Sequence, residues 1–194
     1  TAYRRQRQMC IRDSQHCNDK ILKKMNRRGD KKYLCALLDK LRERIPGLVL
    51  RTSIIAGLPG EGEEEFDELC DFLREQKLLR AGVFPYSPEE GTRAAKMERV
   101  DSDEAARRAE RIVDIQSEII DAWNDERQGD VMEVLCEGFD GQSMLFVGRS
   151  YAESPDIDGR IYFSAPRDVA AGEFVPVRIT GAMDGELTGE LAEE

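Results

Sequence analysis

The chain has 194 residues, of which 35% are charged, and its net charge at pH 7 is −10. This length allows one or two domains with a sizeable core. No stretch approaches 18 uninterrupted apolar residues, which argues against a membrane span, and no apolar signal-peptide core follows the first residues. Five cysteines at scattered spacings exclude a fully paired intrachain disulfide set. We therefore expect a cytoplasmic protein with no membrane partner.

The charge is distributed unevenly along the chain. Residues 1–50 contain 14 Lys and Arg against 5 Asp and Glu, residues 51–128 contain 11 against 20, and residues 129–194 contain 4 against 14. Blocks of this kind predict parts with different neighbours. The acidic last segment would repel phosphate backbones and attract a basic partner.

The sequence between residues 20 and 123 alternates helical and strand patterns. Asp30 is the expected N-cap of a helix whose apolar residues recur between Tyr33 and Ile45. The apolar run at 48–56 predicts a strand buried on both faces. A second helix is expected to hold Glu61, Glu63, Glu64 and Glu65 in its first turn, where carboxylates favour the helix dipole.

A second short strand is predicted at 81–84, and this alternation indicates βα units with a parallel sheet. Asp101 and Glu104 have capping-box spacing and begin a long helix that extends to Trp123. After Gly129 the pattern changes to short alternating segments, which predict a small antiparallel barrel of the oligonucleotide-binding type. These segments are 131–135, 143–147, 160–163, 174–179 and 186–191.

Two loops follow the predicted strands at the edge where ligands bind open α/β sheets. The first, 57–61, has backbone N–H groups that could meet a carboxylate or phosphate, or it is only a tight turn. The second, 86–92, places Glu89 and Glu90 beside a hydroxyl, where they could position a substrate or simply be solvated. The residues alone leave both alternatives open.

His16 is the only histidine, and it precedes Cys17. Such a pair could indicate nucleophilic catalysis or metal binding, but no second histidine and no Cys-x-x-Cys pair accompanies it. A metal centre made by this chain alone is therefore not expected. In the predicted barrel, the polar loop 148–159 is either a recognition loop or an acidic connector.

Several motifs, in this order, resemble those of the radical S-adenosylmethionine methylthiotransferases. They are Gln15-His16, residues 21–28, Leu50-Arg51-Thr52-Ser53, Gly57-Leu58-Pro59-Gly60-Glu61 and residues 86–92. The segment from Gly129 resembles the TRAM domain of that family through Gly148-Arg149-Ser150-Tyr151, Asp156-Ile157-Asp158-Gly159 and Gly181-Ala182. The resemblance covers residues 15–192. It implies an α/β fold, with the C-terminal part of a partial radical-SAM (βα) barrel at 15–127 and a small antiparallel TRAM barrel at 128–194.

Within that family, the loop at 86–92 and the loop at 148–159 resemble the branch that modifies a ribosomal protein. The resemblance implies transfer of a methylthio group to the β-carbon of an aspartate in small-subunit ribosomal protein twelve, by radical S-adenosylmethionine chemistry. Ribosomal proteins are basic, so the acidic last segment agrees with such a partner and disfavours RNA. A fragment of a transfer RNA methylthiotransferase and a non-catalytic module that binds RNA or protein are the alternatives.

The resemblance also implies where ligands bind. The candidate S-adenosylmethionine contacts are Gln15, Arg51, Ser53, Ile55 and Gly57, and among these Arg51 could pair with the carboxylate of the ligand. The candidate substrate contacts are Glu89, Glu90, Arg149, Asp156 and Asp158. No catalytic residue is assigned.

Members of the family hold two 4Fe–4S clusters, one of them on a Cys-x-x-x-Cys-x-x-Cys triplet. The cysteines here are separated by 7, 18, 35 and 66 positions, which fits no such triplet. The resemblance therefore implies a C-terminal fragment that is inactive alone and has no metal ligand of its own. Residues 1–14 match nothing in the family and are left as an unassigned leader.

Overall fold

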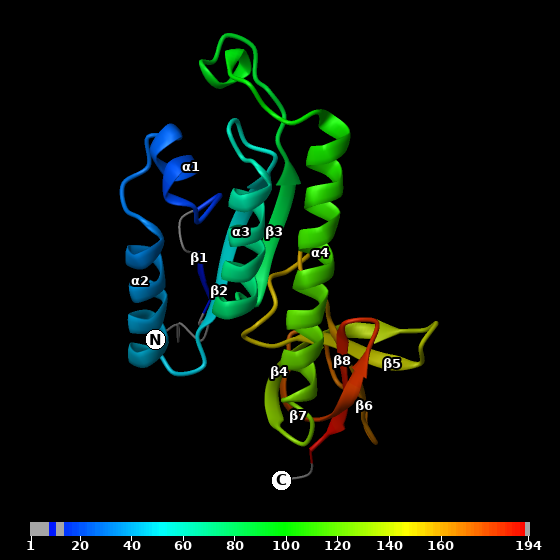
Figure 1. Cartoon of the computed structure of the whole chain (residues 1–194). Helices are drawn as coiled ribbons and strands as arrows, with labels where there is room; N and C mark the ends of the chain where they lie inside the picture. The colour runs from blue at the N-terminus through cyan, green and yellow to red at the C-terminus, as the bar shows by residue number, and fades with distance from the viewer. Residues whose placement is uncertain (1–7, 11–13, 193–194) are drawn as a thin grey trace. The chain divides into compact units, whose positions relative to one another are not determined.

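The structure is a computed structural model that describes residues 8–10 and 14–192 (Figure 1). It divides into two compact units, Met9–Ile119 and Ile120–Glu194, called here the sheet unit and the barrel unit. Most of the unassigned segment 1–14 lies outside the described residues, although Gln8–Cys10 forms a strand, β1.

The sheet unit has three strands in the order β1-β2-β3, with helices between and after them. Strands β2 and β3 are parallel, as predicted, with Arg51 opposite Arg80 and Ala56 opposite Pro85. In chain order after β1 the elements are α1 (Asp19–Lys24), α2 (Lys31–Arg44), β2 (Val49–Ala56), α3 (Glu63–Gln76), β3 (Arg80–Pro85), a short 3-10 helix (Ala94–Lys96) and α4 (Ser102–Asp125).

The helices begin where the sequence offers capping side chains. The Asp30 carboxylate accepts a hydrogen bond from the Tyr33 amide at 2.7 Å, which confirms the predicted cap of α2. The Asp101 carboxylate accepts from the Glu104 amide at 2.8 Å at the start of α4. Glu104 instead binds the Arg107 and Arg108 guanidiniums, so only half of the expected capping box forms.

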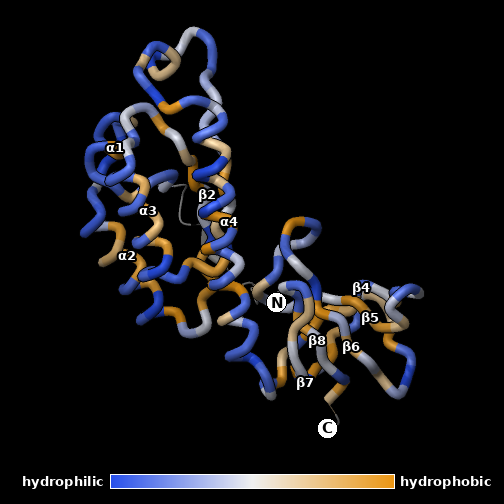
Figure 2. Tube along the Cα trace, turned by 45° about the vertical axis from the view of Figure 1, so that its right-hand side comes forward, coloured by the Kyte–Doolittle hydropathy of each residue, from blue (hydrophilic) through white to orange (hydrophobic). Residues whose placement is uncertain are grey.

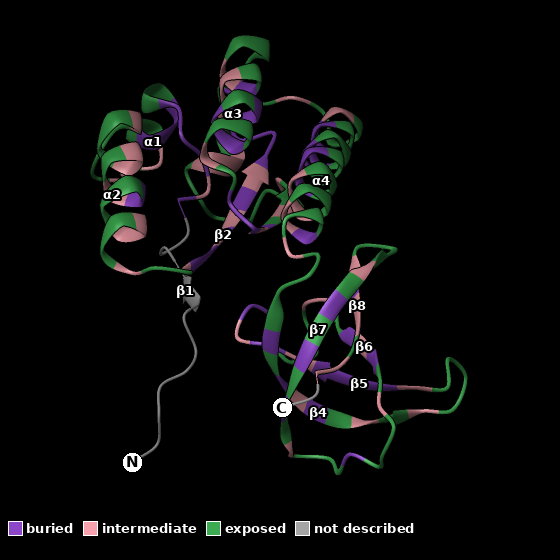
Figure 3. Cartoon of the chain, turned by 90° about the horizontal axis from the view of Figure 1, so that it is seen from below, coloured by how far each residue is buried: buried purple, intermediate pink, exposed green. Residues whose placement is uncertain are grey.

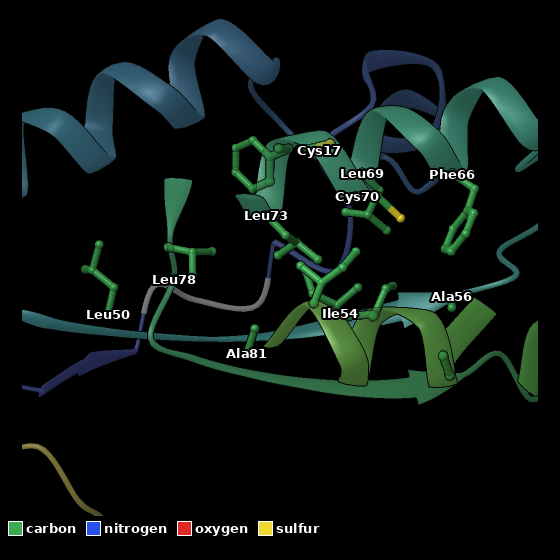
Figure 4. Packing of buried hydrophobic residues seen from close by; sticks show 14 of the residues in the cluster. Cys17, Leu50, Ile54, Ala56, Phe66, Leu69, Cys70, Leu73, Leu78 and Ala81 are labelled. Carbon is green, nitrogen blue, oxygen red and sulfur yellow. The ribbon is translucent and has the colours of Figure 1, made fainter. Parts of the chain in front are cut away.

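The core of the sheet unit lies between β2–β3 and the helices α2, α3 and α4 (Figure 4). Ile54 and Leu69 are fully buried, and Leu73 is 1% exposed. Apolar side chains of this size each contribute about 1.5–3 kcal/mol when buried. The larger set in this core includes Leu38, Leu50, Phe66, Phe72, Leu78, Ile112 and Ile115.

Strand β2 differs from the prediction, because only one of its faces is buried. From Leu50 to Ala56 alternate residues are buried, whereas Arg51, Ser53 and Ile55 between them are half-buried. The continuous apolar run misled the prediction because Ile55 is apolar yet belongs to the open face. One face of this sheet is therefore accessible.

The barrel unit is a closed five-stranded barrel in the order β4-β5-β6-β8-β7, as predicted. All neighbouring strands are antiparallel except β6 and β8, which pair in parallel. The strands are β4 (Val131–Asp140), β5 (Leu145–Arg149), β6 (Ile161–Ser164), β7 (Phe174–Met183) and β8 (Glu186–Leu191).

The barrel has a core of its own, to which every strand contributes, and in β4 and β7 the buried residues alternate with more exposed ones. Figure 3 shows this alternation on β7. Figure 2 shows hydrophobic and hydrophilic residues interspersed through the barrel unit. Val134, Ile161, Phe163 and Val177 are fully buried inside. Among the described residues, no helix is long and apolar enough to cross a membrane.

Candidate functional site

The open face of the sheet unit is built from alternate residues of β2 and β3. The strand register sets Arg51 beside Arg80, Ser53 beside Gly82 and Ile55 beside Phe84. Phe84 is 59% exposed, and a Cβ at Gly82 would meet only the Phe84 ring, at 4.0 Å. The surface above Gly82 is therefore open.

Side chains two apart on a strand are separated by about 6.6 Å, so Arg51 and Ile55 lie about 13 Å apart along this face. The face presents guanidiniums at one end, a hydroxyl in the middle and apolar groups at the other. Such a surface suits an elongated ligand with a carboxylate at one end and a flat apolar ring at the other. S-adenosylmethionine, with its amino-acid and adenine ends, has this layout.

Gln15 lies next to this face through its backbone. Its amide donates to the Ser53 carbonyl at 3.1 Å, and its carbonyl accepts from the Ile55 amide at 2.9 Å. Gln15 has φ of +58°, an uncommon conformation for a residue other than glycine. The structure therefore brings Gln15, Ser53 and Ile55 together at one place.

Gly57 begins the turn that follows β2, and it must be glycine. Its φ is +83°, and a Cβ there would lie 2.6 Å from the Ala105 Cβ on α4. The Gly57 amide donates to the Glu61 carboxylate at 2.9 Å. That amide is already bonded within the protein, so the tight-turn alternative applies to Gly57.

Glu61 is at the centre of a buried charged cluster beside the open face. Its side chain is fully buried, with Oε1 2.8 Å from the Arg108 guanidinium and Oε2 3.3 Å from His16 Nε2. His16 Nδ1 accepts from the Asn18 amide at 3.0 Å, which leaves Nε2 to face Glu61. The helix α3 begins at Glu63, with Glu63, Glu64 and Glu65 in its first turn as expected, so the expectation is wrong only for Glu61.

Burial by itself would raise the pKa of Glu61, but the bonds from His16, Arg108 and the Gly57 amide outweigh it and hold the pKa below its ordinary value. Glu61 is therefore an ionised, fully engaged carboxylate. It fastens the turn after β2 to α4 and to the segment before α1. His16 belongs to this structural cluster, and the nucleophilic alternative for His16 and Cys17 has no support in the geometry.

The candidate substrate residues Glu89 and Glu90 lie on the exposed loop that follows β3. The Glu89 carbonyl accepts from the Thr92 hydroxyl at 2.8 Å, and that hydroxyl also accepts from the Ala95 amide. The hydroxyl is thus used to shape the loop. Within the described part of the chain, neither glutamate side chain forms an ion pair or hydrogen bond.

The other three candidate substrate residues lie in the barrel unit. Arg149 pairs with Glu137 at 2.7 Å. Asp156 is exposed and has φ of +60°. The Asp158 carboxylate accepts from the Ser154 amide at 2.7 Å. Of the three, only Asp156 presents its carboxylate without a described contact.

Comparison with protein families matches a part of each unit. Residues 13–73 match the radical SAM superfamily, and residues 129–192 match the TRAM domain. The chain joins part of a radical SAM domain to a TRAM domain. The predicted fold is thereby confirmed, and the radical SAM match includes β2, one of the two strands of the open face.

Similar proteins are ribosomal protein uS12 methylthiotransferases, named RimO. The protein of Pelotomaculum thermopropionicum is 46% identical over 179 residues, which cover 91% of this chain and 40% of that protein. The protein of Acetivibrio thermocellus is 41% identical over 181 residues, covering 93% and 40%. That of Symbiobacterium thermophilum is 43% identical over 182 residues, covering 92% and 38%. The chain thus spans about two fifths of the length of these relatives.

The residues that the structure describes do not fit an iron–sulfur cluster. Among the described residues, no three His, Cys, Asp or Glu side chains gather as metal ligands. Cys17, Cys70 and Cys136 are buried free thiols, and burial raises the pKa of Cys17 to about 12. A thiol of that kind is a poor source of the thiolate that iron requires.

Three residues of the open face were missed by the sequence analysis: Arg80, Gly82 and Phe84. The register of two parallel strands would have revealed them, since alternate residues of β3 must face the same way as Arg51, Ser53 and Ile55. The buried partner of Glu61, Arg108, had no local signal. It lies 47 positions away on a helix whose other arginines are exposed.

Proposed function

We propose that this chain is part of a cytoplasmic uS12 methylthiotransferase, in which it supplies much of the S-adenosylmethionine surface and the TRAM domain. In this proposal residues 15–127 belong to the radical SAM domain and residues 128–194 to the TRAM domain. The observation that carries it is the open face of β2 and β3, which matches the ligand in length and in chemistry. The similarity to uS12 methylthiotransferases along more than nine tenths of the chain supports it.

Each residue of the open face has a part in this proposal. Arg51 pairs with the ligand carboxylate, Ser53 and the neighbouring Gln15 offer polar contacts, and Ile55 contacts the adenine. Gly57 turns the chain away so that the ligand has room. When bound, S-adenosylmethionine supplies the radical chemistry of the superfamily.

The iron–sulfur clusters of such an enzyme have to be held by residues other than those described here. No step through them is derived from this chain. Among the described residues, the Glu89 and Glu90 carboxylates form no ion pair or hydrogen bond, and they can receive a basic segment of the substrate protein.

The test is a chimera in which residues 15–192 replace the matching segment of the Pelotomaculum thermopropionicum protein. The purified, reconstituted chimera should add a methylthio group to uS12, and its Arg51→Ala variant should bind S-adenosylmethionine more weakly. Modification of transfer RNA instead of uS12 would contradict the proposal. So would a chimera that binds S-adenosylmethionine yet leaves uS12 unmodified.

A further inference from the structure

The loop that joins β5 to β6 in the TRAM domain is held at both ends. At its start, the buried Glu153 carboxylate accepts from the Ser150 amide at 2.8 Å and from the Ser150 hydroxyl at 2.7 Å. At its end, the Arg160 amide donates to the Glu186 carboxylate of β8 at 3.0 Å. One carboxylate therefore closes a turn at the start of the loop, and another, on β8, ties the end of the loop to the barrel.

The middle of the loop is closed by contacts of its own. The Asp158 carboxylate accepts from the Ser154 amide, and the Asp158 amide donates back to the Ser154 carbonyl at 3.3 Å. Pro155 restricts the backbone between them. Asp158 is half-buried and engaged, so it shapes the turn and is not a free charge on the surface.

This closed turn holds one apolar side chain in water. Ile157 is 74% exposed, the highest value among the large apolar side chains that the structure describes as exposed. Single exposed apolar residues are common on protein surfaces. Here, however, the backbone on both sides is fixed, so binding through Ile157 would cost little ordering entropy.

The charge around Ile157 selects the kind of partner. Residues 129–194 contain 14 Asp and Glu against 4 Lys and Arg, and the exposed Asp156 adjoins Ile157 directly. A nucleic acid would be repelled by this domain, whereas a basic protein would be attracted. Ile157 and the acidic residues around it are thus complementary to a protein surface that is cationic and has an apolar pocket.

We propose that Ile157 is the apolar anchor through which the TRAM domain docks a basic protein substrate, with Asp156 facing a cation beside the pocket. This inference rests on the proposed function, from which uS12 follows as the protein to test. Asp158 is a positioning residue that holds the turn. Its carboxylate charge is not part of the contact.

The test measures the affinity of the full chain for purified uS12 by titration calorimetry at physiological salt. Ile157→Ser should raise the dissociation constant about 10- to 100-fold, which corresponds to the loss of one buried isoleucine contact. The matched control is Met144→Ser, because Met144 is 69% exposed on the turn between β4 and β5 of the same domain. That variant should bind like the wild type.

Variants of Asp156 and Asp158 distinguish the effect of surface charge on binding from the effect of the loop conformation. Asp156→Asn should slow association and flatten its salt dependence. Asp158→Asn keeps an oxygen for the Ser154 amide and should bind normally, whereas Asp158→Ala should weaken binding with the fold of the barrel unchanged by circular dichroism.

Equal losses for Ile157→Ser and Met144→Ser would overturn the anchor, as would a wild-type chain that fails to bind uS12 or that binds RNA more tightly. The proposed function is judged separately, by whether the chimera modifies uS12. If the chimera with Ile157→Ser stays active and binds uS12 as tightly as the chimera without that substitution, the docking role of Ile157 is refuted and the proposed function stands.

Discussion

Replacing Arg108 by methionine tests the buried charge cluster of the sheet unit. The guanidinium bonds the Glu61 carboxylate at 2.8 Å and the Glu61 carbonyl at 3.0 Å, and both side chains are under one tenth exposed. Methionine retains apolar volume but leaves the buried Glu61 carboxylate with only His16 and the Gly57 amide beside it. Removing one partner of such a pair costs about 3–5 kcal/mol.

The control is Arg111→Met on the same helix. Arg111 lies over the same Phe66 ring, at 5.4 Å from its centre against 5.0 Å for Arg108. Its ion pair with Asp67 is about half exposed on each side. Exposed pairs contribute about 0–1 kcal/mol, so this variant should be nearly as stable as the wild type.

The assay is urea unfolding at pH 7, followed by far-ultraviolet circular dichroism of the helices. Trp123, the only tryptophan, packs against the barrel core, so its fluorescence reports the barrel unit as an internal reference. A loss under about 1 kcal/mol for Arg108→Met, or equal losses for both variants, would refute the reasoning.

The same cluster gives a pH dependence. The folded pKa of Glu61 lies below its ordinary value of 4.5, so its stabilisation is fully present above that pH and disappears as the pH falls through the folded pKa. Without Arg108 the carboxylate takes up its proton at higher pH. The stability difference between wild type and Arg108→Met should therefore be large at pH 7 and should shrink below pH 4.5.

Three further outcomes are expected. Gly57→Ala should destabilise the sheet unit by about 2 kcal/mol or more in thermal unfolding. The control Gly91→Ala should cost about 1 kcal/mol, because φ is also positive there but no atom lies within 4 Å of a Cβ. Equal losses for the two variants would refute the close approach of α4 to Gly57. Iodoacetamide at pH 8 should label the half-buried Cys35 before Cys17, because burial raises the pKa of the Cys17 thiol to about 12. Peptide mass spectrometry measures the two labelling rates, and faster labelling of Cys17 would contradict its burial. In the chimera, Arg51→Ala should weaken S-adenosylmethionine binding by about 1–3 kcal/mol in equilibrium dialysis, and an unchanged dissociation constant would remove Arg51 from the site.

Much of the fold could be predicted because its signals are local. Asp30 and Asp101 cap their helices with their own side chains, and the period of the barrel strands is present in the sequence itself. The short helix α1 was not predicted. It has only two buried residues, Ile21 and Leu22, too few for a periodic pattern.

The candidate site could be predicted only where one strand defines it. Arg51, Ser53 and Ile55 share a face because they alternate on β2. Phe84 joins them through the register between two strands, which no single segment specifies. The role of Glu61 was mistaken for the same reason, since its position beside the α3 glutamates concealed a partner far along the chain.

The mass spectrum of uS12 tests the central proposal most directly. Cells that lack their own uS12 methylthiotransferase would express the chimera carrying residues 15–192, and uS12 would be isolated and fragmented. The account predicts a single methylthio group in place of one hydrogen on an aspartate side chain, lost with Arg51→Ala. An unmodified uS12 from cells with folded chimera that binds S-adenosylmethionine, or a methylthio group on transfer RNA alone, would contradict it.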